Sequence, residues 1–423
     1  MLIQPILQPL QAAARVPGSK SITNRALMIA ALAQGATRLS NALFSDDSRY
    51  FAQALRDLGF SVAEDESAAA MTVGGLGGRI PAARAELFIG NAGTAARFLS
   101  AFLTLGSGEY VLDGDARMRE RPIADLAAAL RALGAVVETG PTHCPPVTIR
   151  AAGLPGGSTS ISGDISSQFL SALLMAAPYA RGPVEIRLST ELTSRPYVDL
   201  TLAVMADFGV TVERDGYAAF RVSPARYRAL PEYAIEADAS AASYFFAAPA
   251  VCGGSLRVEN ITRSARQGDI QFLGVLERMG CIVAEESGGI RVSRPVGVEL
   301  RGLDVDMRDI SDTAQTLAAV APFAAAPTRI RGIATSRVKE TDRVAAVCAE
   351  LSRLGVRVEE HPDGMTIHPC DRFTPARVRT YKDHRMAMAF ALIGLRVPSV
   401  EIDDPACVSK TFPNFFTVLA SLA

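Results

Sequence analysis

The sequence predicts an α/β protein that is built from six similar units and divided into two domains of three units each. A phrase that joins a helix end, a glycine and a β-branched strand occurs five times, starting at Leu55, Leu130, Met205, Leu276 and Leu351. Alanine-rich segments recur in phase with this phrase, starting near Ser21, Gly93, Ser166, Ala239, Ile310 and Tyr381. Such self-similarity at a fixed spacing is the signature of an architecture made of repeated supersecondary units.

Each copy of the glycine phrase predicts a helix followed by two strands. The residues before the glycine have the spacing of an amphipathic helix, and the glycine suits the left-handed position that ends a helix. The β-branched residues after it favour an extended strand. A second short strand follows each copy, at Met71-Thr-Val73, Val147-Thr-Ile149, Phe220-Arg-Val222, Ile290-Arg-Val292 and Met365-Thr-Ile367.

The alanine-rich segments predict a second set of helices, which are apolar nearly all round after a polar first turn. Helices of this kind are buried on all sides, with one end at a surface. A sixth glycine phrase is missing, and we expect the C-terminal helix 414–422 and an N-terminal strand 2–7 to replace it. The two chain ends then meet in one domain.

The predicted domains are residues 19–236, which are continuous, and residues 1–18 together with 237–423. The chain is expected to cross between them near 16–20 and near 233–238. The alternative is a linear solenoid, in which each unit contacts only its neighbours. Helices that are apolar on all sides favour the two-domain arrangement.

The composition indicates a globular protein outside membranes. Of the 423 residues, 49% are hydrophobic and 21% are charged, and the net charge of -1 argues against binding to nucleic acid or to an anionic membrane. The six cysteines form no CxxC pair, which indicates free thiols in a reducing compartment. The N-terminus lacks the basic region of a signal peptide, and the longest apolar runs are too short for a membrane span. We therefore expect a cytoplasmic protein.

The starts of the six alanine-rich helices predict an anion-binding site. If the three helices of a domain are parallel, their N-termini share one face, and each offers N–H groups and a partial positive charge. Two facing domains would direct six such ends into one cleft. Ordinary helix capping explains the hydroxyl and acidic residues at these positions. It does not explain why Lys20, Arg97 and Arg385 lie within about a turn of the same ends.

Basic residues also recur in the loops that follow these helices, at 117–122, 194–197, 337–343 and 409–411. Four basic loops at one phase of a repeat favour a polyanion site over a solvated surface. Asp312 and Glu340 lie among these cations and are the natural general base and acid of such a site. No metal-ligand spacing, dinucleotide fingerprint or P-loop is present, so we expect neither a metal nor a cofactor.

Seven motifs, in order along the chain, resemble those of the 5-enolpyruvylshikimate-3-phosphate (EPSP) synthase family of enolpyruvyl transferases. They are Pro17-Gly-Ser-Lys-Ser-Ile-Thr-Asn-Arg25, Gly90-Asn-Ala-Gly-Thr-Ala-Ala-Arg97, Arg119-Glu-Arg-Pro-Ile123, Gly163-Asp-Ile-Ser-Ser-Gln168, Arg337-Val-Lys-Glu-Thr-Asp-Arg343, Asp383-His-Arg-Met-Ala-Met388 and Lys410-Thr-Phe-Pro413. The resemblance implies a two-domain inside-out α/β barrel of six βαβαββ-like repeats, with the active site in the cleft between the domains. It also implies a cytoplasmic transferase of the shikimate pathway, in aromatic amino acid biosynthesis.

The resemblance assigns ligands of both substrates, residue by residue. Those for shikimate 3-phosphate are Lys20, Ser21, Arg25, Ser166, Ser167, Gln168, Ser194, Asp312 and Lys339. Those for phosphoenolpyruvate are Lys20, Gly93, Arg121, Gln168, Arg343, Arg385 and Lys410. No other partner is implied, and we expect a monomer.

The implied reaction is addition followed by elimination. The 5-hydroxyl of shikimate 3-phosphate loses its proton to Asp312 and attacks C2 of phosphoenolpyruvate while the methylene carbon is protonated. The tetrahedral intermediate then loses phosphate. Glu340 is the expected carrier of the methyl proton, assisted by Lys20, and the surrounding cations stabilise the leaving phosphate.

Two positions depart from the family pattern. Thr335 stands where many members have an asparagine, and Phe98 stands where a proline is common. Gly93 resembles the form of the site that is sensitive to glyphosate.

Two other functions stay open. UDP-N-acetylglucosamine enolpyruvyl transferase shares the fold, but it uses a cysteine in the loop that corresponds to 114–121, where this chain has none. A non-catalytic phosphosugar sensor would keep the cations without needing Asp312 and Glu340.

Overall fold

The computed structural model describes residues 1–295 and 297–422. The chain divides into two compact units: Gly18–Glu236, called here the continuous unit, and Met1–Pro17 with Ala237–Ala423, called the discontinuous unit. The chain crosses between units after Pro17 and after Glu236, so Gly18 belongs to the continuous unit, one residue before the expected boundary.

The continuous unit contains three four-stranded sheets and three inner helices. Its first repeat comprises α1 (Lys20–Leu32), β2 (Gln34–Ser40), α2 (Asp46–Asp57), β3 (Ser61–Asp65) and β4 (Ala70–Leu76). The second comprises β5 (Arg84–Phe88), α3 (Gly93–Leu103), β6 (Ser107–Asp113), α4 (Ala124–Ala132), β7 (Val136–Thr139) and β8 (Val147–Ala152). The third comprises β9 (Gly157–Ile161), α5 (Ser167–Ala176), β10 (Val184–Leu188), α6 (Arg195–Asp207), β11 (Glu213–Asp215) and β12 (Ala219–Val222), and β13 (Glu232–Ala234) follows it.

The discontinuous unit repeats this plan. It begins with β1 (Leu10–Ala14), and its fourth repeat comprises α7 (Ala239–Cys252), β14 (Gly254–Val258), α8 (Phe272–Met279), β15 (Ile282–Glu286) and β16 (Gly289–Arg294). The fifth comprises β17 (Asp304–Asp306), α9 (Ala314–Val320), β18 (Thr328–Arg331), α10 (Arg343–Arg353), β19 (Val358–His361) and β20 (Gly364–Ile367). The sixth comprises β21 (Arg377–Val378), α11 (His384–Gly394), β22 (Glu401–Ile402) and α12 (Phe415–Ala420).

The five four-stranded sheets share one topology, which shows the repeat directly, and β21 and β22 form a two-stranded parallel sheet. The four-stranded sheets have the orders β13-β2-β4-β3, β5-β6-β8-β7, β11-β12-β10-β9, β1-β14-β16-β15 and β17-β18-β20-β19. In each sheet one edge pair is parallel and the other two pairs are antiparallel. The first sheet takes its parallel edge strand from the far end of the unit, with Tyr233 opposite Leu39. This closure excludes a linear solenoid, because the first and third repeats share a sheet.

The five glycines of the repeated phrase take the left-handed conformation that the sequence predicts. Their φ angles lie between 83° at Gly355 and 107° at Gly280. The second strands of the phrase are all present as β4, β8, β12, β16 and β20. Each glycine therefore reverses the chain from helix to strand, where a side chain at Cβ would be strained.

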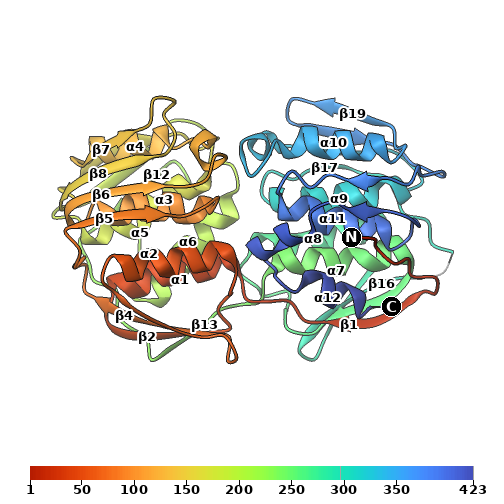
Figure 1. The fold of residues 1–423 in the computed structure, drawn as a ribbon, viewed down its shortest axis with the longest axis horizontal. Coiled ribbons are helices and arrows are strands. Elements are labelled where there is room, and N and C mark those ends of the chain that lie inside the picture. The colour runs from red at the N-terminus through yellow and green to blue at the C-terminus, as the bar shows by residue number, and fades with distance from the viewer. Residues whose placement is uncertain (296, 423) are drawn as a thin grey trace. The chain divides into compact units, whose positions relative to one another are not determined.

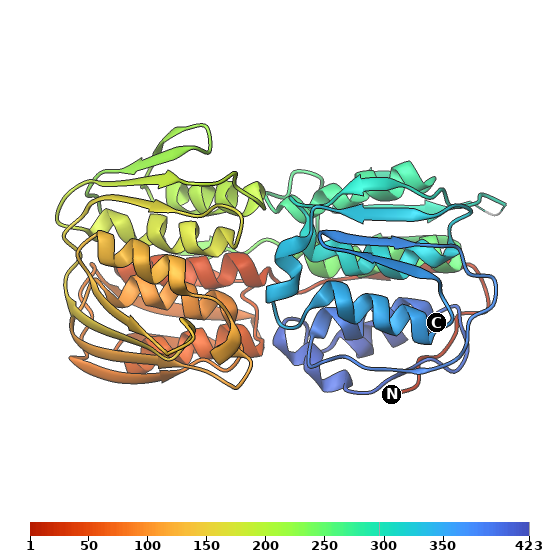
Figure 2. The same cartoon turned by 90° about the horizontal axis from the view of Figure 1, so that it is seen from above.

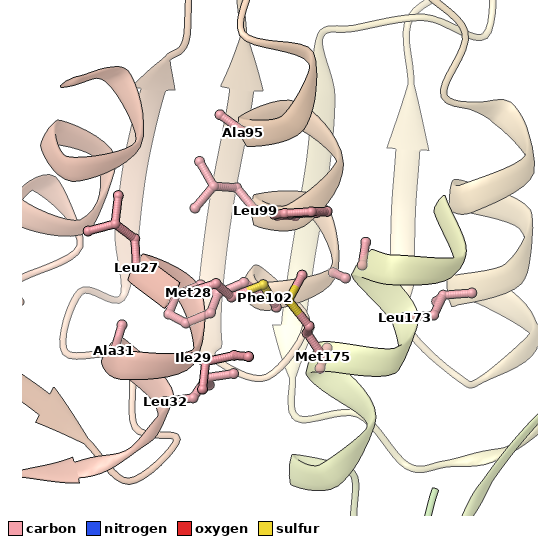
Figure 3. Packing of buried hydrophobic residues seen from close by; sticks show 14 of the residues in the cluster. Leu27, Met28, Ile29, Ala31, Leu32, Ala95, Leu99, Phe102, Leu173 and Met175 are labelled. Carbon is pink, nitrogen blue, oxygen red and sulfur yellow. The ribbon is translucent and has the colours of Figure 1, made fainter. Parts of the chain in front are cut away.

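The inner helices form the core of each unit, as their apolar sequences predict. In α3 and α11 every residue is buried. In the continuous unit α3 packs against both α1 and α5, and in the discontinuous unit α7, α9 and α11 pack against one another. Figures 1 and 2 show the sheets on the outside of these helices in each unit. Figure 3 shows side chains of the three helices meeting in the core of the continuous unit: Met28 and Ile29 from α1, Phe102 from α3 and Met175 from α5.

Both chain ends belong to the discontinuous unit, and the N-terminal segment, predicted as a strand over residues 2–7, is not a regular strand. Leu2 forms a single antiparallel bridge with Glu401, and the N–H of Ile3 donates to the carbonyl of Val400 at 3.0 Å. Pro5 lacks an N–H group and so interrupts any longer ladder. Within the described residues no helix is both long and apolar enough to cross a membrane.

Candidate active site

Three cations converge on Asp312 in the discontinuous unit. The Nζ atom of Lys339 lies 2.6 Å from one carboxylate oxygen, and Arg343 Nη1 lies 3.2 Å from the same oxygen. Arg385 Nη2 lies 2.7 Å from the other oxygen. The side chain of Asp312 is 19% exposed, so its carboxylate is fixed by the cations and still reachable from solvent.

A second carboxylate, Glu340, belongs to the same network. Its Oε2 atom accepts a hydrogen bond of 2.8 Å from Arg343 Nη2, and its Oε1 atom lies 4.0 Å from Lys410 Nζ. Asp383 is fully buried and accepts from Arg343 Nε at 2.7 Å. Arg343 thus joins three carboxylates, and its planar fork of donors suits this role.

A 3-10 turn, a helix start and the loop before that helix position the charged residues of this network. Asp312 lies in a single 3-10 turn, Ser311–Thr313, that precedes α9. Arg343 is the first residue of α10, whose N-cap Asp342 accepts from the N–H of Ala345 at 3.0 Å. Lys339 and Glu340 come from the loop just before it. The predicted helix start near Tyr381 is three residues early, because Tyr381 is left-handed and α11 begins at His384.

Burial sets the electrostatics of the network. Burial lowers the pKa of Lys339, and the opposing attraction of Asp312 does not restore it. Burial also lowers the pKa of Arg343, but Asp383, Glu340 and Asp312 outweigh this and raise it overall. Among the described residues, no group of His, Cys, Asp and Glu is arranged to hold a metal ion.

In the continuous unit, Lys20 is the first residue of α1 and lies beside a buried carboxylate. Its Nζ atom is 3.5 Å from Asp47 Oδ2, and the Asp47 side chain is 2% exposed. Asp47 lies in the first turn of α2, which Ser45 and Ser48 cap reciprocally. The site thus has a Lys20–Asp47 pair that the sequence analysis did not foresee.

The start of α3 is bordered by two arginines. Arg121 Nη1 donates to the carbonyl and the side-chain oxygen of Asn91 at 3.0 and 2.9 Å. Arg97 donates to the carbonyl of Gly93 at 3.2 Å and to that of Pro122 at 2.7 Å. A Cβ atom on Gly93 would lie 2.4 Å from Arg121 Nη2, so the glycine permits this guanidinium to approach the helix.

Arg25 is buried and takes part in hydrogen bonds within its own unit. Its Nε atom donates to the hydroxyl of Thr201 at 2.8 Å, and its Nη1 and Nη2 atoms donate to the carbonyls of Ser21 and Tyr197 at 2.8 and 3.1 Å. The guanidinium also lies over the ring of Phe98, 5.3 Å from the centroid. Phe98, the departure from the family pattern, therefore packs against a predicted substrate ligand.

The remaining predicted residues of this unit lie around the starts of α5 and α6. Ser166 is the N-cap of α5 and accepts from the N–H of Gln168 at 3.3 Å, and Ser167 is the first residue of that helix. Ser194 is the N-cap of α6 and is left-handed, with φ of 58°. The N–H of Tyr197 donates to the carbonyl of Ser194 at 3.1 Å.

One helix start differs from the expectation of six anion-binding ends. At α7, the N–H of Ala239 donates to Gln267 Oε1 at 3.0 Å, and the N–H of Ala241 donates to Asp238 Oδ1 at 2.8 Å. These protein groups take the place of an anion, so we exclude α7 from the candidate site. The loop that supplies Gln267 has the same position in its repeat as the loops that supply Arg121 and Lys339.

Sequence reasoning missed Asp47 and Asp383 as members of these networks. The position of Asp47 within its repeat could have identified it, because Asp47 follows β2 in the first repeat as Lys339 follows β18 in the fifth. In the sequence, Asp383 was noted as the first residue of the motif Asp383–Met388 and not as a partner of the arginines. Thr335 lies in the 3-10 helix Ala334–Val338 and is half-buried.

Comparisons with known proteins agree with the resemblance seen in the motifs. The model of the family described as EPSP synthase (3-phosphoshikimate 1-carboxyvinyltransferase) matches residues 5–419. A 3-phosphoshikimate 1-carboxyvinyltransferase of Nostoc punctiforme is 49% identical over 411 residues, covering 97% of this chain and 96% of that protein. One of Shewanella baltica is 48% identical over 423 residues, covering 99% and 98%.

Solved structures show the same fold. EPSP synthase from Acinetobacter baumannii has a TM-score of 0.81 and 25% identity, covering 100% of this chain and 98% of that one. The enolpyruvyl transferase NikO from Streptomyces tendae has a TM-score of 0.78 at 18% identity, covering 100% and 96%. The predicted fold class, a two-domain inside-out α/β barrel, is confirmed, and the sheets of each unit do not close into barrels themselves.

Proposed function

This chain belongs to the EPSP synthase family, and on that premise we propose how its residues carry out the family's reaction. It is an enzyme of the shikimate pathway that transfers the carboxyvinyl group of phosphoenolpyruvate to 3-phosphoshikimate, which is shikimate 3-phosphate. One observation carries the residue assignment: Lys339, Arg343 and Arg385 converge on a single carboxylate. That carboxylate, Asp312, is the proposed base.

Asp312 is proposed to accept the proton of the 5-hydroxyl group as its oxygen attacks C2 of phosphoenolpyruvate. The cations fix the direction of both carboxylate oxygens, and the side chain is 19% exposed, so a hydroxyl group can reach it. A base held in this way needs little reorganisation when the substrate arrives. Lys339 would bind the phosphorylated substrate at the same point.

Glu340 is proposed to carry the proton at the methylene carbon, assisted by Lys20. In the addition step the methylene carbon gains a proton from Glu340 and C2 gains the bond to oxygen. In the elimination step the methyl group returns that proton, the C2–O bond to phosphate breaks, and the double bond forms again. The hydroxyl proton leaves with the phosphate, so atoms balance over the two steps.

The other assignments divide between the two substrates. For phosphoenolpyruvate we propose the cations together with the small and amide residues at the helix starts: Lys20, Gly93, Arg121, Gln168, Arg343, Arg385 and Lys410. For shikimate 3-phosphate we propose Lys20, Ser21, Arg25, Ser166, Ser167, Gln168, Ser194, Asp312 and Lys339. The proposed ligands of each substrate include residues of both units.

The decisive experiment is phosphate release with both substrates present. We expect release that depends on both phosphoenolpyruvate and shikimate 3-phosphate, with none from either alone. Release with UDP-N-acetylglucosamine as acceptor, and none with shikimate 3-phosphate, would establish the rival transferase instead. Binding of shikimate 3-phosphate without any turnover would establish the sensor.

We further propose that the enzyme is a cytoplasmic monomer without bound nucleic acid. Six free cysteines and a biosynthetic family support this location. Light scattering of the purified protein should give the mass of one chain, and an absorbance spectrum should show no nucleic acid. A mass of two or more chains would refute the monomer.

A further inference from the structure

The turn before α11 holds two strained residues beside the candidate site. Tyr381 and Lys382 have φ angles of 55° and 56°, which are left-handed and unfavourable for residues with a Cβ atom. They directly precede Asp383, the N-cap of α11. Two such residues in succession persist only where surrounding contacts hold them, and strain of this kind gathers at functional sites.

The buried carboxylate of Glu350 holds the first part of this turn. Glu350 is 1% exposed and lies in the last turns of α10. It accepts from the N–H of Arg379 at 3.0 Å and from the hydroxyl of Tyr381 at 2.8 Å, and Arg353 Nη1 lies 3.0 Å away. Burial, followed by the hydrogen bond to Glu350, raises the pKa of Tyr381 to about 12. The hydroxyl therefore keeps its proton and donates.

The opposite end of α10 holds the end of the same turn. Arg343, its first residue, binds Asp383 through Nε at 2.7 Å. Asp383 also accepts from the N–H of Arg385 at 2.9 Å, and the Arg385 side chain binds Asp312 at 2.7 Å. One helix thus contacts the strained turn at two points, and Asp383 binds the guanidinium group of Arg343 and the backbone N–H of Arg385.

We propose that Glu350 and Tyr381 are positioning residues for phosphoenolpyruvate. They hold the turn 380–383 so that Asp383 fixes the guanidinium group of Arg343 and the backbone of Arg385, whose own guanidinium group binds Asp312. This rests on the proposed function, in which those two arginines bind phosphoenolpyruvate. Neither positioning residue touches the substrate.

The test is Tyr381→Phe, which keeps the ring and removes only the hydroxyl group. A hydrogen bond to a charged acceptor is lost, so we expect KM for phosphoenolpyruvate to rise about fivefold to tenfold. KM for shikimate 3-phosphate should stay within about twofold of the parent value, because most of its proposed ligands belong to the continuous unit. The matched control is Tyr217→Phe, which removes a hydroxyl that lies 2.5 Å from Asp199 in that unit, and it should change neither KM.

A second substitution at Lys382 distinguishes a positioning role of Tyr381 from a general effect on stability. Asparagine adopts left-handed φ angles more readily than most residues, whereas glutamine does not. In the Tyr381→Phe background, Lys382→Asn should therefore restore most of the KM for phosphoenolpyruvate, and Lys382→Gln, with the same loss of charge, should not.

Three results would overturn the proposal: an unchanged KM for phosphoenolpyruvate in Tyr381→Phe, an equal rise in both KM values, or no difference between the Asn and Gln rescues. A parent enzyme that releases no phosphate would instead refute the proposed function, so the two failures are distinguishable. Thermal unfolding of each variant shows whether the fold is retained.

Discussion

The cations of the two units differ in what they are bonded to. In the discontinuous unit, Lys339, Arg343 and Arg385 lie against the carboxylates of Asp312, Glu340 and Asp383. In the continuous unit, three arginines donate to neutral oxygens. Arg25 binds hydroxyl and carbonyl groups, Arg97 binds carbonyl groups, and Arg121 binds the carbonyl and amide oxygens of one asparagine.

Neutral oxygens and carboxylates have different consequences for the cations that they bind. Carbonyl and hydroxyl groups orient an arginine through their dipoles and carry no net charge themselves. Carboxylates neutralise part of the charge of the arginine, but they supply groups that can take and return protons. In the proposed mechanism the continuous unit contributes cations that bind the substrates, and the discontinuous unit contributes cations together with the carboxylates that transfer protons.

The largest expected effect comes from the carboxylates of the discontinuous unit. Asp312→Asn and Glu340→Gln keep the side-chain shape and remove the proton acceptor, so kcat should fall by about 10²- to 10⁴-fold. Steady-state phosphate release measures this. Glu360→Gln is the control, since Glu360 is a half-exposed partner of Arg337 in the same unit and its loss should leave kcat unchanged. Near-normal kcat in both site variants would contradict the proposal that carboxylates of the discontinuous unit transfer the protons.

In the continuous unit, Lys20 is paired with the buried carboxylate of Asp47. Asp47→Asn leaves Lys20 without its charged neighbour, so kcat should fall about tenfold to a hundredfold, as expected for the loss of a partly buried ion pair. Asp46→Asn makes the same change of charge one residue earlier, at an exposed position, and should have little effect. Equal kcat values for the two variants would show that Lys20 does not depend on Asp47.

Gly93 tests the binding role of the continuous unit. In Gly93→Ala the new Cβ atom would lie 2.4 Å from Arg121 Nη2, so the guanidinium must move. We expect KM for phosphoenolpyruvate to rise about tenfold while kcat changes little, which is the signature of lost uniform binding. Gly274→Ala in α8 is the control, because nothing lies within 4 Å of its Cβ position. A fall in kcat with an unchanged KM would argue that Arg121 acts in the chemical step.

The smallest expected effect concerns the cysteines, five of which lie in the discontinuous unit. Burial raises the pKa of Cys252, Cys348 and Cys407 to about 12. The thiolate, which is the reactive form, is then scarce below that pH, and its fraction rises only as the pH approaches 12. Treatment with iodoacetamide at pH 8 should leave activity intact. Rapid inactivation would indicate a cysteine in the chemistry, as in the rival transferase.

Much of the site followed from local sequence, and the rest depended on contacts between distant segments. The basic loops were recognisable because Arg121, Lys339 and Lys410 recur at one phase of the repeat. The partners Asp47 and Asp383 were missed, since an acidic residue in a first helical turn is usually explained by capping. The left-handed pair at Tyr381 and Lys382 was missed as well, because neither residue type favours that conformation.

The sequence by itself determined the repeat, the buried helices and the glycine that ends each outer helix. These features depend on the periodicity of apolar residues and on backbone preferences, both of which are local. Only the tertiary structure decided which polar groups were available to a substrate. At α7 the side chain of Gln267 binds the helix start, whereas at Asp312 three cations meet a carboxylate that is still reachable from solvent. Hydrogen bonds and ion pairs are satisfied by atoms that are close in space, and residues remote in the sequence supply them.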